Sequence, residues 1–465
     1  MGSWRGEFLD VREMRAIELN AEELGFTEEL MMENAGAWVA KIASEKGNSF
    51  LILAGKGGKG GDGLVAARHL ALMGKDVKVL FPYKECEVTK ESTLKNLIRA
   101  RMSDVQFVRE PFEAEVIIDA LLGTGVKGAP RGIARELIEW ANGTSAYKIS
   151  IDVPSGMNPD TGECELCFNA DLVVSVHRAK KGLKEIMSKV KVVEIGIPRR
   201  AERYLGKGDL ELAPRRKRKG LNGKVAVIGG SEKYQGAPWL SALAAFRAGA
   251  DLVFVYTPNR MDYPELIWRS LNPSDLLEGL YRDGVNVIVV GPGLHATSKE
   301  VVKVVLKYIE ERKEARVVID ADGLKALAEL DVKFSWRAVL TPHLGEASRL
   351  LGREVSDDLQ SRIEAAGEIG NKYEACVILK GETDVVYCNG RTVLNDRGNA
   401  YMTVGGTGDV LSGVVGALLG RDEPWWAAKA ATLAVTLAGE KCVKERGHSS
   451  PSCLIEEVPR VLSGY

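Results

Sequence analysis

Hydrophobic and polar positions along the chain first predict a series of helices and strands in its N-terminal half. Amphipathic helical segments at 9–24 and 27–45 precede an apolar, strand-like run at Ser49–Ala54. Apolar runs rich in β-branched residues then alternate with helical periodicity. We expect further strands at 76–81, 115–119, 147–151, 171–176 and 191–195.

A second series of the same kind begins near residue 223, at GKVAVIGGS. It predicts further strands at 251–257, 285–291, 316–320, 338–342 and 375–380, and a hairpin from Asp384 that turns at Asn389 and Gly390. Two successive βαβ series predict two α/β domains with mostly parallel sheets, at 1–212 and 213–465. Ligands of such sheets bind beyond the carboxyl ends of the strands.

Composition narrows the class of protein. The 465 residues include 63 Lys and Arg against 64 Asp and Glu, a net charge of −1, with 45% hydrophobic residues. This is typical of a globular protein and gives no field of one sign, so we expect neither a nucleic-acid nor a membrane partner. No apolar run approaches the ~18 residues that span a bilayer, and the first residues are charged. We therefore expect a cytoplasmic protein.

Cysteine usage favours a reducing compartment. The seven cysteines are odd in number and scattered, which predicts reduced thiols. Cys164 and Cys167 form a CxxC pair, but no second pair completes four zinc ligands. We expect them to be ordinary thiols on a loop.

A glycine-rich segment, AGKGGKGGDG at 54–63, follows the first strand and opens a helix. Its amides can turn toward an anion at the helix N-terminus. Gly55, Gly57 and Gly60 satisfy GxGxxG, which alone would suggest hydride transfer with a nicotinamide cofactor. The next strand, however, ends in Phe81 and Pro82 without the carboxylate that binds a ribose hydroxyl. A phosphate loop of the NTPase kind is also excluded, because its lysine and hydroxyl residue are missing.

Three more segments accompany it in order: MENAG from Met32, DALLGTGVKGAPRG from Asp119, and IDVPSG from Ile151. Over about residues 9–212 this set resembles the NAD(P)H-hydrate epimerase family, which interconverts the R and S forms of hydrated NADH and NADPH. The resemblance implies a Rossmann-like three-layer domain. It also implies contacts with the hydrated dinucleotide from Gly58, Lys59, Gly60, Gly61, Asp62, Gly123, Thr124, Gly125, Val126, Lys127, Gly128, Ala129 and Asp152.

The same resemblance implies an ion and an acid or base. Asp119 and Ser155 match positions that hold potassium, but Lys59 stands where an asparagine would bind that ion. We hypothesise that the Lys59 ammonium replaces potassium; alternatively, Lys59 points into solvent and epimerase activity is reduced. Epimerisation needs proton transfer at a hydroxyl, so the general acid or base is Asp119 or Asp152. Alternatively, Asp152 only caps the turn before Pro154.

In the second half, GGTGD at 405–409 is the most informative motif. Its glycines precede an apolar helical pattern, so their amides can cradle an anion while Asp409 lies in the first helical turn. A phosphoryl-transfer site needs this arrangement of donors and carboxylate. Alternatively, the motif is only a helix cap at a tight turn.

Five further segments accompany GGTGD: IGGSEKYQGAPW from Ile228, VVGPGL from Val289, IDADGL from Ile319, TPHLGE from Thr341 and LKGETDVV from Leu379. Over about 214–465 the set resembles the ribokinase-like NAD(P)H-hydrate dehydratase family, in which ADP or ATP phosphorylates the hydrate and loss of phosphate restores NAD(P)H. The resemblance implies Asp409 as catalytic base and Mg²⁺ with the nucleotide. Implied contacts are Ala237, Gly293, His343 and Asp409 for the substrate, and Lys380, Gly381, Glu382, Thr383, Asp384, Gly406, Thr407 and Gly408 for the nucleotide.

The roles of a few residues in this half are not assigned. Glu346 could orient magnesium or water, or simply sit near the helix dipole, and Asp320 and Asp322 have no assigned role. Tyr401 stands where relatives tend to carry glycine, which puts the shape of the pocket in doubt.

The leading interpretation is therefore a bifunctional repair enzyme that epimerises NADH- and NADPH-hydrate and dehydrates the S form with ADP or ATP. We also expect a homo-oligomer. One alternative is a ribokinase-type vitamin or sugar kinase with a regulatory N-terminal domain. Another is a first domain that only binds nucleotide or protein.

Overall fold

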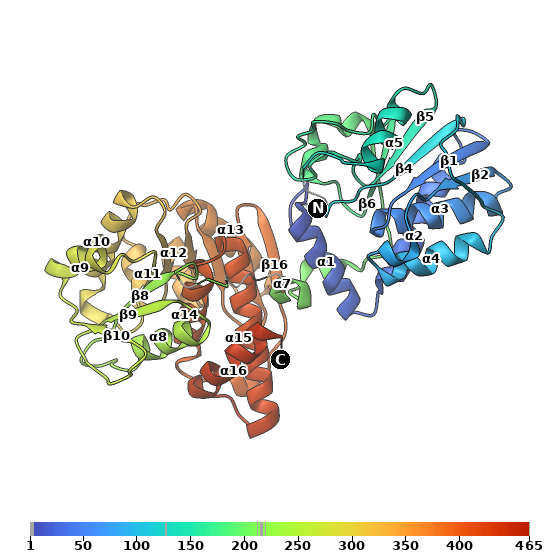
Figure 1. The fold of residues 1–465 in the computed structure, drawn as a ribbon. Coiled ribbons are helices and arrows are strands. Elements are labelled where there is room, and N and C mark those ends of the chain that lie inside the picture. Colours follow the sequence, from blue (N-terminus) through green and yellow to red (C-terminus); the bar gives the residue numbers. More distant parts are fainter. Residues whose placement is uncertain (1–3, 126–127, 212, 214–216, 219, 465) are drawn as a thin grey trace. The chain divides into compact units, whose positions relative to one another are not determined.

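The computed structural model describes residues 4–125, 128–211, 213, 217–218 and 220–464. The expected contacts Val126 and Lys127 lie outside them, as do 212, 214–216 and 219 around the expected domain boundary. The chain forms two compact units, Met1–Ala201 and Glu202–Tyr465, drawn in Figure 1. This division precedes the expected boundary at 212 and 213, because the next residues pack on the second unit. Tyr204 bridges to Leu394, and Asp209 pairs with Lys429 at 2.9 Å.

The first unit has a seven-stranded sheet in the order β3-β2-β1-β4-β5-β6-β7, and every pairing in it is parallel. Its strands are β1 (Ser49–Ala54), β2 (Asp76–Leu80), β3 (Gln106–Val108), β4 (Val116–Ala120), β5 (Tyr147–Ile151), β6 (Leu172–Val176) and β7 (Val190–Val193). Its helices are α1 (Val11–Glu23), α2 (Glu28–Ala43), η1 (Glu85–Glu87), α3 (Gly58–Leu72), α4 (Glu91–Arg101), α5 (Ile133–Asn142), η2 (Lys181–Lys189) and α6 (Arg199–Arg203).

Each face of this sheet is buried by its own helices. Phe50 and Ile52 belong to the apolar cluster that includes α1, α2, α3 and α4, whereas Leu51 and Leu53 belong to the cluster that includes α5. Successive strand residues point to opposite faces, and a parallel sheet covered on both sides needs apolar residues at both positions. The unit is therefore the three-layer α/β domain that the sequence predicts.

The second unit has a nine-stranded sheet in the order β10-β9-β8-β11-β12-β13-β14-β15-β16, parallel except for the pairs β14-β15 and β15-β16. Its strands are β8 (Lys224–Ile228), β9 (Leu252–Tyr256), β10 (Ile267–Arg269), β11 (Val287–Val290), β12 (Arg316–Ile319), β13 (Ala338–Leu340), β14 (Cys376–Leu379), β15 (Asp384–Cys388) and β16 (Arg391–Asn395). Its helices are α7 (Lys207–Glu211), α8 (Ala237–Arg247), α9 (Pro273–Asp283), η3 (His295–Thr297), α10 (Ser298–Glu311), α11 (Asp322–Leu327), α12 (Leu344–Leu351), α13 (Leu359–Tyr373), η4 (Ala400–Met402), α14 (Thr407–Leu419), α15 (Pro424–Arg446) and α16 (Pro451–Ser463).

Helices cover both faces of this sheet as well. A Cβ on Gly416 of α14 would meet Val289 of β11, and α8 packs tightly on α14. On the other face, α13 packs on the sheet, because a Cβ on its Gly370 would meet Tyr387. The strand pairings place Tyr387 on the same face as Val290, which is opposite to the face of Val289. The expected α/β class is confirmed for both units. Within the described residues, no helix is long and apolar enough to span a membrane.

The prediction of reduced thiols was wrong. Disulfides join Cys164 to Cys167, Cys376 to Cys388 and Cys442 to Cys453, and Cys86 is the free, exposed cysteine. An odd count leaves one thiol over but does not prevent three pairs. The hairpin β15-β14 and the packed helices α15 and α16 bring the last two pairs together, which spacing alone could not show. Disulfides do not settle the compartment, because intracellular proteins of hyperthermophiles also carry them.

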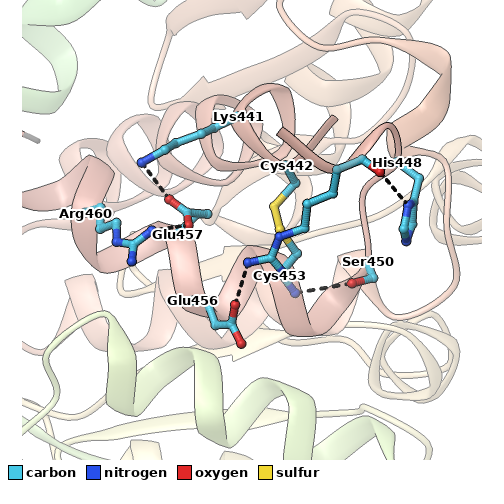
Figure 2. The surroundings of a disulfide bond; sticks show 9 residues. Lys441, Cys442, His448, Ser450, Cys453, Glu456, Glu457 and Arg460 are labelled. Atoms are coloured by element: carbon cyan, nitrogen blue, oxygen red, sulfur yellow. Dashed lines mark hydrogen bonds and ion pairs between the residues drawn. A yellow bond between two sulfur atoms is a disulfide. The ribbon is translucent and has the colours of Figure 1, made fainter. Parts of the chain in front are cut away.

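The Cys442–Cys453 disulfide ties α15 to the start of α16 (Figure 2). Ion pairs from Lys441 to Glu457 and from Arg446 to Glu456 also join the two helices. Both sulfur-bearing residues are buried. We expect a variant with both cysteines replaced by Ala to lose about 2–3 kcal/mol of unfolding free energy, because the bridge closes a loop of about this entropic value. Denaturant unfolding followed in the second unit measures this, and Cys86→Ser is the matched control. A loss below about 0.5 kcal/mol would contradict the expectation.

Candidate active sites

The glycine-rich turn between β1 and α3 is close-packed at the carboxyl edge of the first sheet. A Cβ on Gly55 would lie 1.9 Å from the Leu121 carbonyl oxygen, and one on Gly60 would lie 1.8 Å from the Gly55 carbonyl oxygen. A side chain at either position would collide with backbone, so the tight turn requires glycine. The turn places Lys59 in the first turn of α3.

Lys59 is buried, with a relative exposure of 6%, and its ammonium lies in a cage of oxygens. Burial lowers the pKa of Lys59, and the carboxylate of Asp119 opposes that effect. The alternative that Lys59 points into solvent was wrong. The Lys59 Nζ donates to Asp119 Oδ2 at 2.7 Å, Val153 O at 2.8 Å, Ser155 Oγ at 3.0 Å and Ser150 Oγ at 3.2 Å.

Asp119, at the end of β4, has no exposed surface. Its two oxygens accept hydrogen bonds from five donors, which fills the approximately four lone-pair positions of a carboxylate. A substrate therefore finds no unused acceptor on Asp119. The donors are Lys59 Nζ at 2.7 Å, Ser150 Oγ at 2.7 Å, Ser155 N at 2.8 Å, Ser155 Oγ at 2.5 Å and Leu121 N at 3.1 Å.

Asp152, after β5, is more accessible, because 19% of its side chain is exposed. Its backbone φ of +61° is a left-handed conformation that non-glycine residues rarely adopt. Asp152 Oδ1 accepts from the buried Lys180 ammonium and from Val176 N at 3.1 Å. These partners lie outside the turn before Pro154, so these hydrogen bonds of Asp152 do not cap that turn. Sequence reasoning missed Lys180, because RAKKG resembles a solvated basic stretch.

Asp62, on α3, is the third carboxyl group of this region. Burial, and then the charge of Asp152, raises the pKa of Asp62 well above its ordinary value. Asp62 and Asp152 are thus two neighbouring carboxyl groups in different surroundings, as in sites that combine an acid with a base. The loop after β4 reaches the same place, since a Cβ on Gly123 would lie 3.5 Å from the Lys59 Cβ and Leu122 N donates to Ser155 Oγ.

Among the remaining expected contacts of the first unit, Gly61 is buried against Met32, and the others are half-buried or exposed. Gly58 begins α3, with the Lys90 ammonium 3.4 Å from where its Cβ would be. The loop residues Gly123, Gly125 and Gly128 are exposed, and Thr124 and Ala129 are half-buried. The structure thus places the glycine loop, Asp152 and Ser155 together, with the residues after Gly123 at the open rim.

In the second unit, the expected site residues also gather at the carboxyl ends of the strands. His343 bridges to Lys380, whose ammonium lies 3.0 Å from Asp320 Oδ1. A Cβ on Gly408 would lie 3.4 Å from the Lys380 Nζ, so α14 begins directly over this ammonium. A Cβ on Gly293 would lie 3.4 Å from the Ala237 Cβ, which brings these two expected substrate contacts together.

Asp409 is in the first turn of α14, with Gly406 as N-cap at a φ of +93°. The free amides at such a helix start can bind an anion. Burial, and then the charge of Asp320, raises the pKa of Asp409 to about 7, while Lys380 opposes the rise. A carboxyl group that titrates near neutral pH suits general-base catalysis.

His343 and Glu346 form a reciprocal cap at the start of α12. His343 Nδ1 accepts from Gly345 N at 3.0 Å, and Glu346 Oε2 accepts from His343 N at 2.9 Å. A capping box satisfies two backbone donors of a helix start. Glu346 thus lies in the first helical turn, as one of the two interpretations expects; its orienting magnesium or water stays a prediction. The His343 ring keeps 61% of its surface exposed and can still meet a ligand.

The turn KGETD at 380–384 is stabilised by hydrogen bonds to the side chain of its own aspartate, Asp384. Asp384 accepts from Gly381 N at 3.1 Å and from Asn395 Nδ2 at 3.0 Å, and burial raises its pKa. Gly381 and Glu382 are exposed and Thr383 is half-buried. Asp384 therefore shapes the turn, and the exposed residues before it are the ones that can face a nucleotide.

Tyr401 lies in η4, before GGTGD, and is 67% exposed. Its carbonyl oxygen accepts from Ser449 N at 3.3 Å. Tyr401, which stands where relatives tend to carry glycine, thus places an exposed ring in the segment before α14. It does not fill the space around Asp409 with a buried side chain.

Comparisons with known proteins agree with both halves. A family described as NAD(P)H-hydrate dehydratase matches residues 225–460, and one described as YjeF-related protein N-terminus matches residues 28–182. A bifunctional NAD(P)H-hydrate repair enzyme of Methanopyrus kandleri is 40% identical, over 98% of this chain and 96% of that one. One of Hyperthermus butylicus is 38% identical, over 98% and 93%.

Two of the matching solved structures each cover a little over half of the chain. A ribokinase-like superfamily protein of Enterococcus faecalis is 26% identical, with a TM-score of 0.51, over 57% of this chain and 96% of that one. An ADP/ATP-dependent NAD(P)H-hydrate dehydratase of Bacillus subtilis, co-crystallised with ATP and Mg²⁺, is 26% identical, with a TM-score of 0.48, over 55% and 95%. From the full-length relatives and the matching family domains, this chain belongs to the family of bifunctional NAD(P)H-hydrate repair enzymes.

Proposed function

We propose that the first unit epimerises R and S NAD(P)H-hydrate and that the second dehydrates the S form with a phosphoryl group from ADP or ATP. The observation that carries the proposal is Asp409, a half-buried carboxyl group at the start of α14 with a pKa of about 7. It stands beside glycine amides that can bind a phosphoryl group. The observed pattern supports a base and an anion cradle in one helical turn.

In the second unit, Asp409 takes the proton of the hydrate hydroxyl while the hydroxyl oxygen attacks the terminal phosphorus of the nucleotide. The bond from that phosphorus to the bridging oxygen breaks, and AMP or ADP leaves. The lone pair of the ring nitrogen then expels inorganic phosphate, and loss of a proton from the adjacent carbon restores the dihydronicotinamide. Amides of Gly406, Thr407 and Gly408 hold the migrating charge. The turn at Lys380 to Asp384 binds the nucleotide, while Ala237, Gly293 and His343 face the hydrate.

In the first unit, we assign the proton transfer to Asp152. Asp119 is fully hydrogen-bonded and unexposed, whereas Asp152 is partly open and lies near Asp62, whose pKa burial and then the charge of Asp152 raise. In its protonated form, Asp62 would donate a hydrogen bond to the hydroxyl that Asp152 deprotonates. The glycine loop and the residues from Gly123 to Ala129 would bind the dinucleotide.

The potassium that the family resemblance implies does not fit the oxygens of Asp119 and Ser155, because the Lys59 ammonium lies against both. We propose that Lys59 supplies the positive charge there and that no step depends on potassium. Magnesium needs no site made by the protein alone. The described residues contain no cluster of three or more His, Cys, Asp or Glu able to hold a metal. Mg²⁺ commonly binds through nucleotide phosphates and waters with few carboxylates, so it would enter with the nucleotide. The domain limits, the cytoplasmic location and the homo-oligomer stay predictions.

A mixture of R and S NADH-hydrate with Mg²⁺ and either ADP or ATP tests the proposal. We expect the near-ultraviolet absorbance of NADH to recover beyond the S fraction, faster than spontaneous epimerisation allows. Recovery that stops at the S fraction would leave only the dehydratase. A stable phosphorylated product from a vitamin or sugar, with no NADH, would instead support the kinase alternative.

A further inference from the structure

One ammonium group lies among three carboxylates at the carboxyl edge of the second sheet. Lys380, after β14, donates to Asp320 Oδ1 at 3.0 Å, and Asp320 follows β12 with a side-chain exposure of only 3%. Burial lowers the pKa of Lys380, but the charges of Asp320, Glu346 and Asp409 outweigh burial and raise it. The Lys380 ammonium is therefore paired with Asp320 and attracted by two further carboxylates, those of Glu346 and Asp409.

The backbone fixes Asp320 where it can hold this ammonium. A Cβ on Gly291 would lie 1.8 Å from the Asp320 carbonyl oxygen, and Ala321 has a φ of +47°. Such close approach and left-handed backbone persist where the surrounding structure enforces them. Asp320 N also donates to Val290 O at 3.1 Å. The strand end and the turn after it thus leave the Asp320 carboxylate facing Lys380.

The pair lies directly below the proposed base. The Lys380 Nζ is 3.4 Å from where a Cβ on Gly408 would be, and Asp409 is the next residue. An ammonium paired with Asp409 would keep that carboxylate ionised but make it a weaker base. An ammonium paired with Asp320 leaves the Asp409 oxygens available to the substrate hydroxyl. We propose that Asp320 is a positioning residue of the dehydratase, which holds Lys380 away from Asp409 so that Asp409 can act as the base.

This inference rests on the proposed function of the second unit, and its test is the pH dependence of dehydration. The charged groups that act on Asp409 are Asp320, after β12, and Lys380, after β14. Glu346 on α12 acts on Lys380, and His343 caps α12. Replacing Asp320 by Asn removes a negative charge and frees Lys380, so we expect the acid limb of the kcat/KM profile to move down by about one pH unit, with a lower plateau. Replacing Lys380 by Met removes the positive charge, so the limb should move up.

Two further measurements separate positioning from structural damage. Lys380→Met should also raise the KM for the nucleotide, whereas Asp320→Asn should leave it unchanged. Asp322→Asn, two residues further on and bonded to His295 N and Lys325, is the matched control and should leave the acid limb in place. Thermal unfolding confirms that each variant is folded.

The outcomes are distinguishable. If the unchanged protein does not dehydrate the hydrate at all, the proposed function fails. If it does, but Asp320→Asn leaves the acid limb where it was or moves it in the same direction as Lys380→Met, the role of Asp320 is overturned while the function stands.

Discussion

Replacing Asp409 by Asn is expected to slow dehydration by about 10²–10⁴-fold, because the variant loses the group that takes the hydroxyl proton. Asn keeps the size of the side chain and its place in the first turn of α14, so the anion cradle of Gly406 and Gly408 should remain. The nucleotide should therefore still bind, and the loss should fall on kcat. Epimerisation in the first unit should be unchanged.

The pKa of Asp409 sets the sign of the pH dependence in the unchanged protein. The base form is the ionised one, and the pKa of about 7 means that it dominates above that pH. Dehydration should thus fall about tenfold per pH unit below pH 7, since each unit removes most of the remaining base. In Asp409→Asn the residual rate should lose this acid limb.

The rate of NADH recovery from purified S-hydrate, measured at saturating nucleotide and at a series of pH values, gives both the loss of rate in Asp409→Asn and the pH dependence. Asp262→Asn, an exposed carboxylate of the same unit, is the control and should retain full activity. A variant at Asp409 that keeps more than about a tenth of the rate while remaining folded would exclude this residue as the base.

The fold could be predicted largely because buried parallel strands are continuous apolar runs. Ser49–Ala54 and Tyr147–Ile151 were expected with the observed bounds, and most other expected strands differ by one or two residues at an end. The short edge strands β3 and β10 were not expected, since three residues are too few to show a period. The disulfides were missed because pairing depends on tertiary contact.

The candidate sites could be predicted to the extent that sequence motifs determine the backbone conformation around them. Glycines that must approach other backbone, such as Gly55 and Gly60, identify their turns. Carboxylates such as Asp119 and Asp409 lie at the end of a strand or in the first turn of a helix. The sequence could not show which carboxylates are saturated. Lys180, which pairs with Asp152, and the pairing of Asp320 with Lys380 depend on side chains from distant segments, and no local pattern reports these.

Lys59 illustrates this limit, and replacing it should cost the first unit much of its stability. In Lys59→Met the Asp119 carboxylate stays buried but loses its ammonium, and removing one partner of a buried ion pair typically costs about 3–5 kcal/mol. Both side chains are nearly unexposed, at 4% and 0%, so solvent cannot replace the charge. Denaturant unfolding of the first unit measures the loss. Lys56→Met, on the same turn but exposed, is the control and should change stability by less than about 0.5 kcal/mol.

Potassium distinguishes a replaced ion from an ordinary ion pair. The unchanged protein should epimerise and unfold equally in sodium and potassium salts, because the Lys59 ammonium already occupies the oxygen cage. Lys59→Asn restores a neutral amide and frees that space, so added potassium should raise its unfolding temperature and recover epimerisation, as a ligand that binds only the folded state does. A strong potassium requirement in the unchanged protein would show that the ion binds despite Lys59. Failure of potassium to stabilise Lys59→Asn more than sodium does would mean that the cage is built for an ammonium alone.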